Sequence, residues 1–498
     1  MMSQRELLSH PTCELNMNNS SVYKEINKGI KLRLFPAISL LILIFISVIS
    51  IVISFSAIGR QGYSLMFLLP IMFIFLLVAI NGRFNEIPSN IGFTLVLGIE
   101  FIRLVLVPVL FVIGDYPETI TYKAEANNLY GILLQVYEVL WIAYALQKKT
   151  SEKKLYQVTS FDDQRASKRI TRIVLFAMII TAGICIVAPE ILLNYRLITM
   201  ATDKEFTNLE QSFVVNAYAS SSIKKFFLVL ANYILKPMRL IVPAFIMHVI
   251  YKMNRRSSWT KPISLFLALS PFIFVDGTVA RSLYFSIVLL FFYNKLYGMN
   301  IKRLGIAIGA AVVFIFAYWI VRYNSTMTSI PYTSYFGEKL NDYFCGFNIV
   351  GAVDSLPKDI AFRFKYFAHD YIRCIPFANT LFNLDGNDTV RVFFNTYTNA
   401  PNGQIPATLA MGCYYFTPLF APIYSYVFTR LAINYGNKAR IVNNPYYTMV
   451  WNLCALYFAL GIGVNDVSVT LSNFVQVILP VMIMIRVSYP YDKGEPLI

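Results

Sequence analysis

Long apolar runs recur along this sequence, and they constrain its fold more than any other feature. The hydrocarbon core of a bilayer is about 30 Å thick, so a helix that spans it needs about 20 mostly apolar residues. The sequence therefore predicts an all-α fold, a polytopic membrane protein with about 12 transmembrane helices. The candidate spans are 34–57, 63–81, 91–113, 129–146, 173–189, 226–251, 262–275, 282–294, 304–321, 403–428, 446–462 and 468–485.

The distribution of charge supports this class and orients the chain. Only 14% of the residues are charged, whereas a soluble domain carries about 25%. Short loops rich in Lys and Arg stay on the cytoplasmic side of a membrane. The loops 148–154, 252–261 and 295–303 obey this rule if the N-terminus lies inside. We therefore expect both termini to be cytoplasmic. The net charge of +16 is explained by basic cytoplasmic loops and does not indicate a nucleic-acid-binding protein.

These spans define the expected domains, which are a cytoplasmic tail at 1–33, nine helices within 34–321, a large external loop at 322–402, three helices within 403–485 and a cytoplasmic tail at 486–498. A smaller external loop is expected at 190–225. The large loop is rich in Tyr and Phe and has as many acidic as basic residues, which is not the composition of a disordered segment. We expect it to fold as an extracytoplasmic cap.

Cysteine and motif content limit the chemistry. Cys345 and Cys374 are the two cysteines expected on the external side of the membrane, where an oxidising compartment would permit a bridge; two free thiols are the alternative. The sequence has no Cys or His cluster with metal-ligand spacing, no nucleotide-phosphate loop and no dinucleotide-binding fingerprint. No metal and no cofactor are therefore expected.

Several charged residues lie inside the candidate spans, where each costs about 2.5–3.5 kcal/mol at the bilayer centre. Lys236 and Arg239 lie one turn apart in the sixth span. Glu100 and Arg103 lie one turn apart in the third span, and Glu138 lies at a similar depth in the fourth. Two interpretations stay open, namely ion pairing between spans and a pocket or path for an anionic ligand or an ion.

The stretch FRFKYFAHDYIRCIPF in the large loop predicts a helix, because no helix breaker occurs before Pro376. Lys365, His369 and Arg373 are spaced four residues apart and share one helical face, with Asp370 beside them. This basic face suits an anionic partner, since Arg binds phosphate through a planar fork. A solvated basic edge on a packed helix is the alternative.

A polar turn leads directly into the tenth span in the stretch TNAPNGQIPATLAMGCYYFTPLFAPIYSYVF. Asn399, Asn402 and Gln404 offer uncharged donors and acceptors that suit sugar hydroxyls, and Gly412 permits close helix packing. An ordinary helix start with an Asn cap is the alternative. Arg281, at the outer start of the eighth span, suits either an anionic ligand or a lipid headgroup.

This stretch and the layout of about twelve spans with a large external loop before a late span resemble the O-antigen polymerase family, also called oligosaccharide repeat-unit polymerases. Thr417 and Ala421 replace helix glycines that are usual in that family. The resemblance implies a GT-C-type membrane glycosyltransferase in the bacterial inner membrane. It would join undecaprenyl-pyrophosphate-linked repeat units into O-antigen or a related surface polysaccharide at the outer face. The implied partners are these lipid-linked glycans, membrane lipids and a chain-length regulator.

The reaction that the resemblance implies gives roles to the residues above. A pyrophosphate leaving group needs cations that stabilise its developing charge, and an acceptor hydroxyl needs a general base. The expected catalytic residues are His369 or Asp370 as the base, and Arg281 and Arg373 on the pyrophosphate. The expected substrate-binding residues are Arg322, Arg391, Lys365, Asn399, Asn402, Gln404, Lys236 and Arg239.

The alternative function is a lipid-linked oligosaccharide flippase or another secondary transporter, because twelve spans and charges within them also suit transport. The sequence lacks the two similar halves that are common in such transporters. A membrane acyltransferase acting on the same glycans is a third option, but no His-centred catalytic motif lies in a predicted span.

Overall fold

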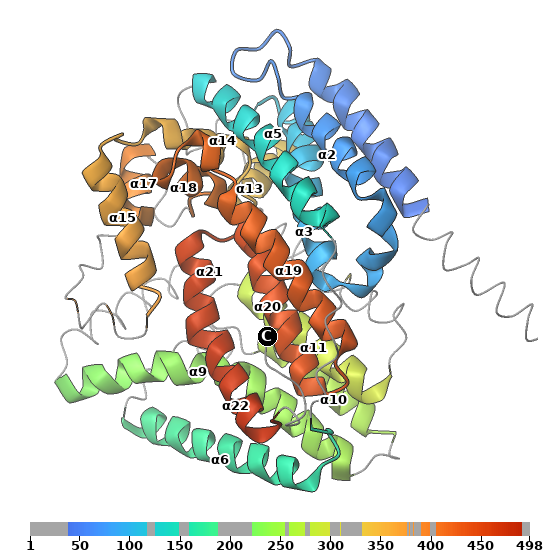
Figure 1. Cartoon of the computed structure of the whole chain (residues 1–498), viewed down its shortest axis with the longest axis vertical. Helices are drawn as coiled ribbons and strands as arrows, with labels where there is room; N and C mark the ends of the chain where they lie inside the picture. Colours follow the sequence, from blue (N-terminus) through green and yellow to red (C-terminus); the bar gives the residue numbers. More distant parts are fainter. Residues whose placement is uncertain are drawn as a thin grey trace, which may run out of the picture.

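The computed structural model describes residues 38–116, 125–148, 159–187, 222–253, 258–273, 279–298, 331–375, 390–398 and 405–490, together with residues 309, 378 and 382. Helices make up the regular structure of these residues, and none of these residues lies in a strand. The all-α class expected from the apolar runs is therefore confirmed (Figure 1).

Six of the described helices are long and apolar enough to cross a membrane. They are Ile38–Phe55, Ile91–Ile113, Asn127–Gln147, Gln164–Ile186, Ile234–Met253 and Val467–Ser488. Each of them overlaps a predicted span. A bent pair, α2 (Leu68–Ala79) and the segment Asn81–Ile87, adds a seventh if its two parts, which meet at 86°, form one span. These apolar helices are those of a membrane protein.

The other predicted spans have different outcomes. α10 (Thr260–Ile273) and α11 (Val279–Tyr297) overlap the seventh and eighth predicted spans and pack side by side, but α10 has only 14 residues. α20 (Pro445–Gly463) is a helix where the eleventh span is predicted. The ninth span, at 304–321, lies outside the described residues apart from residue 309. A total of twelve spans therefore stays a prediction.

The tenth predicted span, 403–428, is wrong as a single helix. α18 (Thr408–Tyr415) ends before the segment TPLFAP, in which Thr417 has a φ of 146°, and α19 (Ile423–Ile441) begins after it. The apolar character of the sequence continues across this break, so hydropathy alone does not reveal it. The two prolines of the segment lack the backbone N–H that a continuous helix needs.

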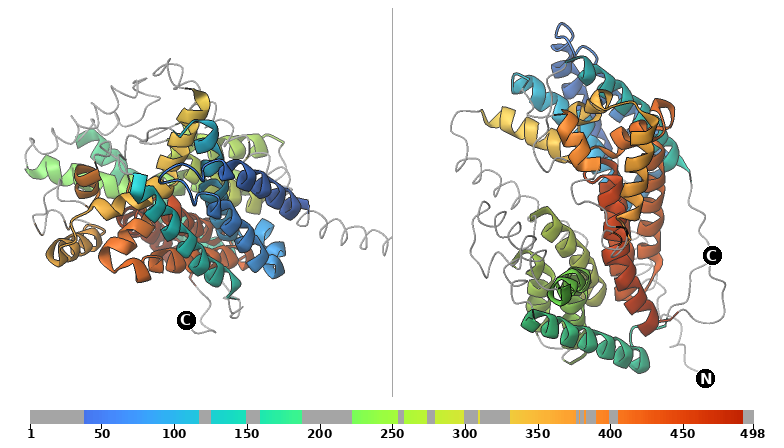
Figure 2. Two further views of the ribbon diagram at one scale, coloured as in Figure 1. Left: turned by 90° about the horizontal axis from the view of Figure 1, so that it is seen from above. Right: turned by 90° about the vertical axis from the view of Figure 1, so that its left-hand side faces the viewer.

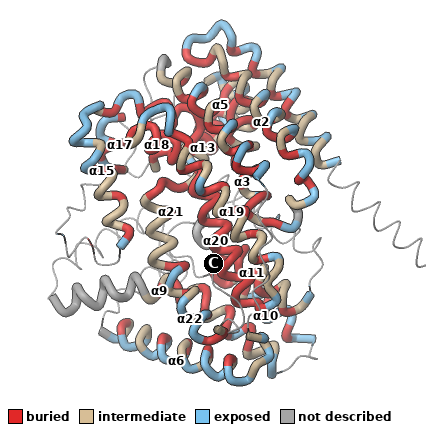
Figure 3. Tube along the Cα trace, viewed as in Figure 1, coloured by how far each residue is buried: buried red, intermediate tan, exposed pale blue. Residues whose placement is uncertain are grey.

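α20 is the central helix of the fold. All of its 19 residues are buried (Figure 3), because α3 (Ile91–Phe101), α11 and α19 pack around it. Tyr446, Asn452 and Tyr457 place polar side-chain groups on this buried helix. A helix enclosed by other helices can carry such polar groups, since none of them is exposed to hydrocarbon.

Two long helices cross one end of the molecule. α6 (Gln164–Val187) and α9 (Ser222–Met253) lie side by side there (Figures 1 and 2). Both contact α22 (Leu479–Ser488), the end of the last predicted span. The first helix of that span, α21 (Val467–Asn473), contacts a helix of the large loop. The last span therefore connects this end of the molecule with the loop.

The helices of the large loop gather at the other end (Figure 1). We call them the loop helices, and they are α13 (Tyr332–Tyr343), α14 (Phe347–Gly351), α15 (Ile360–Ile372) and α17 (Val390–Thr398). α14 packs closely on α5 (Glu125–Gln147) through two glycines. A Cβ added at Gly131 would overlap the carbonyl oxygen of Phe347, and one at Gly351 would overlap that of Asn127. The described part of the loop is therefore helical and packed against the spans, and its role as an external cap stays a prediction.

Candidate functional site

Arg103 is a fully buried charge inside the spans. It lies in a single π-helical turn, η2 (Ile102–Leu106), within the third predicted span. Its Nη1 donates to Oε1 of Glu100 at 2.8 Å, and its Nη2 donates to Oε2 of Glu138 at 2.8 Å. Ser425 donates to the other oxygen of Glu138. All three charged side chains are closed to solvent, so the geometry favours ion pairing between spans over an open ligand pocket or ion path.

Lys236 and Arg239 lie on α9, and the structure places Lys236 apart from the loop helices. Its Nζ donates to Oε1 of Gln476 at 3.0 Å. Gln476 lies nine residues after Val467, the first residue of the last span, which is about 14 Å along the helix axis. Arg239 is half-buried one turn further along α9. Lys236 therefore contacts the middle of the last span and is not part of the site described below.

α15 is the helix predicted in the large loop, and it is confirmed. Asp359 caps its N-terminus by accepting a hydrogen bond from the backbone N–H of Ala361 at 2.8 Å. Lys365 is exposed, whereas His369 and Arg373 are half-buried near the C-terminal end. The basic face therefore divides into an exposed Lys365 and two groups that are partly enclosed by protein.

Asp370 and Asp466 form the centre of the candidate site, and we call them the acid pair. Each residue is only 2% exposed. Tyr415, at the end of α18, donates to Oδ2 of Asp370 at 2.5 Å. Asp466 is the N-cap of α21, and its Oδ1 accepts from the backbone N–H of Val469 at 2.6 Å. Because α15 packs against α21, the two carboxyls lie within electrostatic reach of each other.

Burial raises the pKa of both carboxyls. The pKa of Asp370 rises to about 8, first through burial and then through the charge of Asp466, while Tyr415 and Arg373 oppose the shift. The pKa of Asp466 rises to about 6 through burial, and backbone N–H groups and the charge of Arg391 limit this rise. At neutral pH a mostly protonated carboxyl therefore lies beside a mostly ionised one.

Two guanidinium groups flank the acid pair. Arg373 is the C-cap of α15, and its charge acts on Asp370. Arg391 lies in the first turn of α17, and its charge acts on Asp466. Burial lowers the pKa of Arg391, yet both arginines remain partly exposed. The structure therefore brings Arg373, which is expected on the pyrophosphate, and Arg391, which is expected to bind substrate, to the same acid pair.

Aromatic side chains join α15 to α18 and α19 beside the acid pair. The hydroxyls of Tyr371 and Tyr424 are 2.7 Å apart. The ring of Phe367 lies 5.5 Å from that of Tyr415 and 5.8 Å from that of Phe416, measured between centroids. Tyr415 and Phe416 therefore pack against the helix of the large loop, and Tyr415 also donates a hydrogen bond to Asp370.

Several predicted site residues are not placed. Arg322, Asn399, Asn402 and Gln404 lie outside the described residues. Arg281 lies in the first turn of α11, but its side chain is outside the described part of the structure. Their predicted roles stay predictions.

Cys345 and Cys374 are free thiols, so the bridge considered from the sequence does not form. The Sγ of Cys345 contacts the carbonyl oxygen of Ile405 at 3.7 Å, whereas the Sγ of Cys374 donates to the backbone carbonyl of Asp370 at 3.0 Å. Both side chains are buried. Within the described ranges, no group of three or more His, Cys, Asp or Glu residues is arranged to hold a metal ion.

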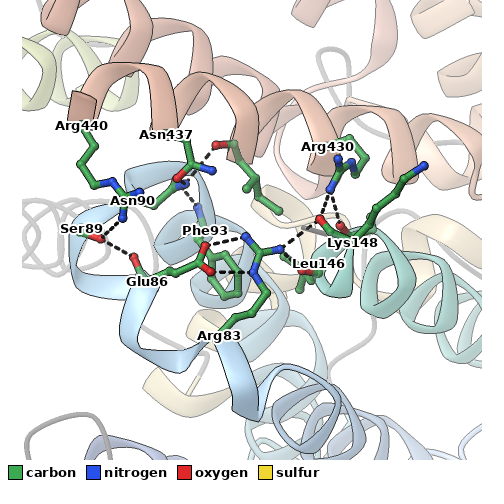
Figure 4. A network of polar contacts seen from close by, with 12 residues as sticks. Arg83, Glu86, Ser89, Asn90, Phe93, Leu146, Lys148, Arg430, Asn437 and Arg440 are labelled. Atoms are coloured by element: carbon green, nitrogen blue, oxygen red, sulfur yellow. Dashed lines mark hydrogen bonds and ion pairs between the residues drawn. The ribbon is translucent and has the colours of Figure 1, made fainter. Parts of the chain in front are cut away.

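A separate polar network lies at the C-terminal end of α5, opposite to the end on which α14 packs (Figure 4). Arg83 forms an ion pair with Glu86 at 2.6 Å and donates to the backbone carbonyl of Leu146. Arg430, from α19, donates to the carbonyl of Lys148. These arginines bind carbonyl groups that the C-terminal turn of α5 leaves unpaired, where positive charge is favourable. The network therefore caps a helix and fixes it to its neighbours.

Sequence reasoning missed Asp466, although a local signal exists. Asn465 and Asp466 form a short polar pair between two apolar helices. An Asp directly before an apolar run is typical of a helix N-cap. This signal predicts the helix start, but it does not show that Asp370 lies next to the cap.

The chain matches no family model, no curated protein and no solved structure. The function must therefore be inferred from the site itself. That site is a buried acid pair flanked by two partly exposed arginines, at the junction of the loop helices with the last predicted span.

Proposed function

We propose that this protein is a polysaccharide polymerase, a metal-independent membrane glycosyltransferase. It joins oligosaccharide repeat units carried on undecaprenyl pyrophosphate into O-antigen or a related surface polysaccharide. The proposed site of action is the outer face of the bacterial inner membrane. Both termini are then cytoplasmic, and residues 322–402 form an extracytoplasmic cap on about twelve spans.

The acid pair between two arginines is the observation that carries this proposal. Transfer of a sugar from a lipid pyrophosphate requires a group that accepts the proton of the acceptor hydroxyl. It also requires cations beside the departing pyrophosphate. The acid pair, Arg373 and Arg391 offer both kinds of group within one cluster. The proposal assigns the pyrophosphate to the two arginines and the base to a carboxylate of the acid pair, whereas the sequence-based expectation is His369 or Asp370.

The remaining predicted residues complete the proposed substrate site. Asn399, Asn402 and Gln404 bind sugar hydroxyls, and Arg281 and Arg322 are further pyrophosphate ligands. Lys365, exposed on the same helix as Asp370, suits an anionic group at the edge of the site. A chain-length regulator is a proposed partner that would act on the length of the product.

A flippase or another secondary transporter is the alternative, and its support is weaker in the structure than in the sequence. Charges inside the spans were its main argument. Arg103 is neutralised by Glu100 and Glu138, and all three side chains are closed to solvent. These charges stabilise contacts between helices and do not line an open path.

The surface polysaccharide of a gene-deletion strain separates the two functions. On a gel, loss of a polymerase leaves single capped repeat units, whereas loss of a flippase leaves no repeat units. In the complemented strain, Arg373→Ala and Arg391→Ala should each slow transfer by about 10²–10³-fold, by analogy with a lost oxyanion donor. The polysaccharide ladder, which is the series of gel bands from chains of increasing length, should then contain only short chains.

Controls at matched membrane expression make this test specific. Replacement of either arginine by Lys should rescue poorly, because Lys lacks the planar fork. Lys358→Ala should leave the ladder intact, since Lys358 is 70% exposed on the same loop and pairs with Asp354 at 3.1 Å. A full ladder for both Arg373→Ala and Arg391→Ala would remove the acid pair and its arginines from the active site.

A further inference from the structure

Asp370 and Asp466 occupy opposite kinds of helix end. Asp466 begins α21, where the backbone N–H groups of Val469 and Ser468 hydrogen-bond its carboxylate. The positive end of the helix dipole also stabilises a negative charge there. Asp370 lies in the last turn of α15, where the dipole disfavours a charged carboxylate. Helix geometry therefore favours a charged Asp466 and a protonated Asp370.

The charge of Asp466 also opposes the ionisation of Asp370. Both carboxyls are buried, and a second negative charge within electrostatic reach of the first is unfavourable in a poorly solvated interior. The pKa of Asp370 is raised to about 8 and that of Asp466 to about 6, with burial as the first cause of each shift. Neighbouring titratable groups whose pKa values are separated in this way divide into a proton carrier and a base.

The surrounding groups are compatible with this division. The titratable and charged groups that act on Asp370 are Asp466, Tyr371, Arg373, Cys374, Tyr415 and Tyr424. Those that interact with Asp466 are Asp370, Cys345, Cys374, Arg391 and Tyr415. Burial raises the pKa of the Cys345 thiol to about 12 and that of Cys374 to about 11. Both thiols are therefore uncharged at neutral pH, and the two arginines supply the positive charge around the pair.

We propose that Asp466 is the general base of the transfer reaction and that Asp370 holds the proton in the resting site. This assignment rests on the proposed polymerase function. In the reaction, the oxygen of the acceptor hydroxyl bonds to the anomeric carbon of the donor sugar, and the bond from that carbon to the pyrophosphate oxygen breaks. The electron pair leaves with the pyrophosphate beside Arg373 and Arg391, and the hydroxyl proton moves to Asp466.

The experiment must separate a base from a simple helix cap. Asn caps a helix as well as Asp does, so Asp466→Asn keeps the cap acceptor and removes the charge. We expect this variant to keep the wild-type melting temperature and to lose polymer formation by about 10²–10⁴-fold, the usual contribution of a general base. Asp370→Asn resembles the protonated carboxyl, so its loss of polymer should be much smaller. Asp466→Ala should lower both activity and melting temperature.

A second measurement does not depend on polymer synthesis. The folded protein keeps a proton on Asp370 that the unfolded chain releases above its ordinary pKa of about 3.9. The stability that Asp370 contributes is therefore complete at low pH and is lost as the pH rises toward 8. In melting curves between about pH 5 and pH 9, Asp370→Asn should remove this part of the decline. Tyr415→Phe should move it to higher pH, because the hydroxyl of Tyr415 favours the charged form of Asp370.

The outcomes that overturn the assignment are distinct. A full ladder for Asp466→Asn at matched expression would show that Asp466 is a helix cap and is not the base. If Asp370→Asn leaves the pH dependence of the melting temperature unchanged, Asp370 does not hold the proton. If Asp466→Asn fails to fold, Asp466→Ser, which also caps well, takes its place. If deletion of the gene leaves the ladder intact, the polymerase function fails, whereas the pH profiles still decide where the proton lies.

Discussion

Replacing Arg103 alone should destabilise the protein more than replacing the whole group of ion-paired residues around it. Arg103 donates to Glu100 and to Glu138, each at 2.8 Å, and none of the three side chains reaches solvent. Arg103→Met removes the positive charge that both carboxylates share and leaves two buried carboxylates without a cation, although Ser425 still donates to Glu138. Leaving one partner of a buried ion pair uncompensated costs about 3–5 kcal/mol.

The same geometry predicts a different cost for each carboxylate. Glu100→Gln leaves Arg103 paired with Glu138, and Glu138→Gln leaves it paired with Glu100, so one compensated pair persists in each case. We expect both variants to lose less free energy of unfolding than Arg103→Met. In Glu138→Gln, the hydroxyl of Ser425 can still donate to the side-chain carbonyl.

The triple variant Glu100→Leu, Arg103→Met and Glu138→Leu tests the reasoning most directly. It removes every charge of the group and puts apolar side chains in their place, and such replacements of buried ion pairs are often neutral or stabilising by about 1–4 kcal/mol. The assay is unfolding of the purified protein in mixed detergent micelles, followed by circular dichroism. If Arg103→Met were as stable as the wild type, or if the triple variant were less stable than Arg103→Met, the account of these charges as a closed ion-paired group would be wrong.

Three further predictions concern packing, thiols and topology. Gly131→Ala should lower the free energy of unfolding by about 1–3 kcal/mol, because its Cβ would overlap the backbone of α14. Gly183→Ala is the control, because the space around Gly183 is open, and equal melting temperatures for the two variants would contradict the close contact at Gly131. Cys345 and Cys374 should react with maleimide only after unfolding, and without prior reduction, and a need for reductant would show a bridge. An alkaline phosphatase fusion after Lys339 should be active if the large loop is external, and high activity of a β-galactosidase fusion at the same position would place the loop in the cytoplasm.

Individual helices were predictable because hydropathy is a local property. The runs at 91–113 and 468–485 coincide with Ile91–Ile113 and Val467–Ser488, since each of these helices has to present an apolar surface over its whole length. α15 was predictable for a similar reason, because fourteen residues without a helix breaker precede Pro376. The hydropathy pattern failed where a continuous helix and a broken helix have the same apolar composition. The apolar run at 403–428 continues through TPLFAP, so the break before α19 left no mark on hydropathy.

The position of the buried charges was less predictable than their presence. Glu100, Arg103 and Glu138 were noticed as charges inside spans, yet the spacing of Glu100 and Arg103 along one helix says nothing of the third partner on α5. Whether such a group is a closed ion pair or an open pocket depends on the helices that pack over it. α20 and α19 enclose this group, with Gly463 against the side chain of Arg103 and Ser425 on Glu138.

The candidate site shows the same limit in its strongest form. Arg373 and Asp370 were found because they share a short helix with a clear charge pattern, and Asp466 was missed because its own neighbourhood describes only a helix start. The effect of Asp466 on Asp370 arises only when α15 packs on α21, which brings the negative end of one helix dipole near the positive end of another. That contact raises the pKa of Asp370 above that of Asp466, through burial and through the charge of Asp466 itself. Two carboxyls of the same residue type then differ in pKa and in the end of the helix that each occupies, and this difference exists only in the folded chain.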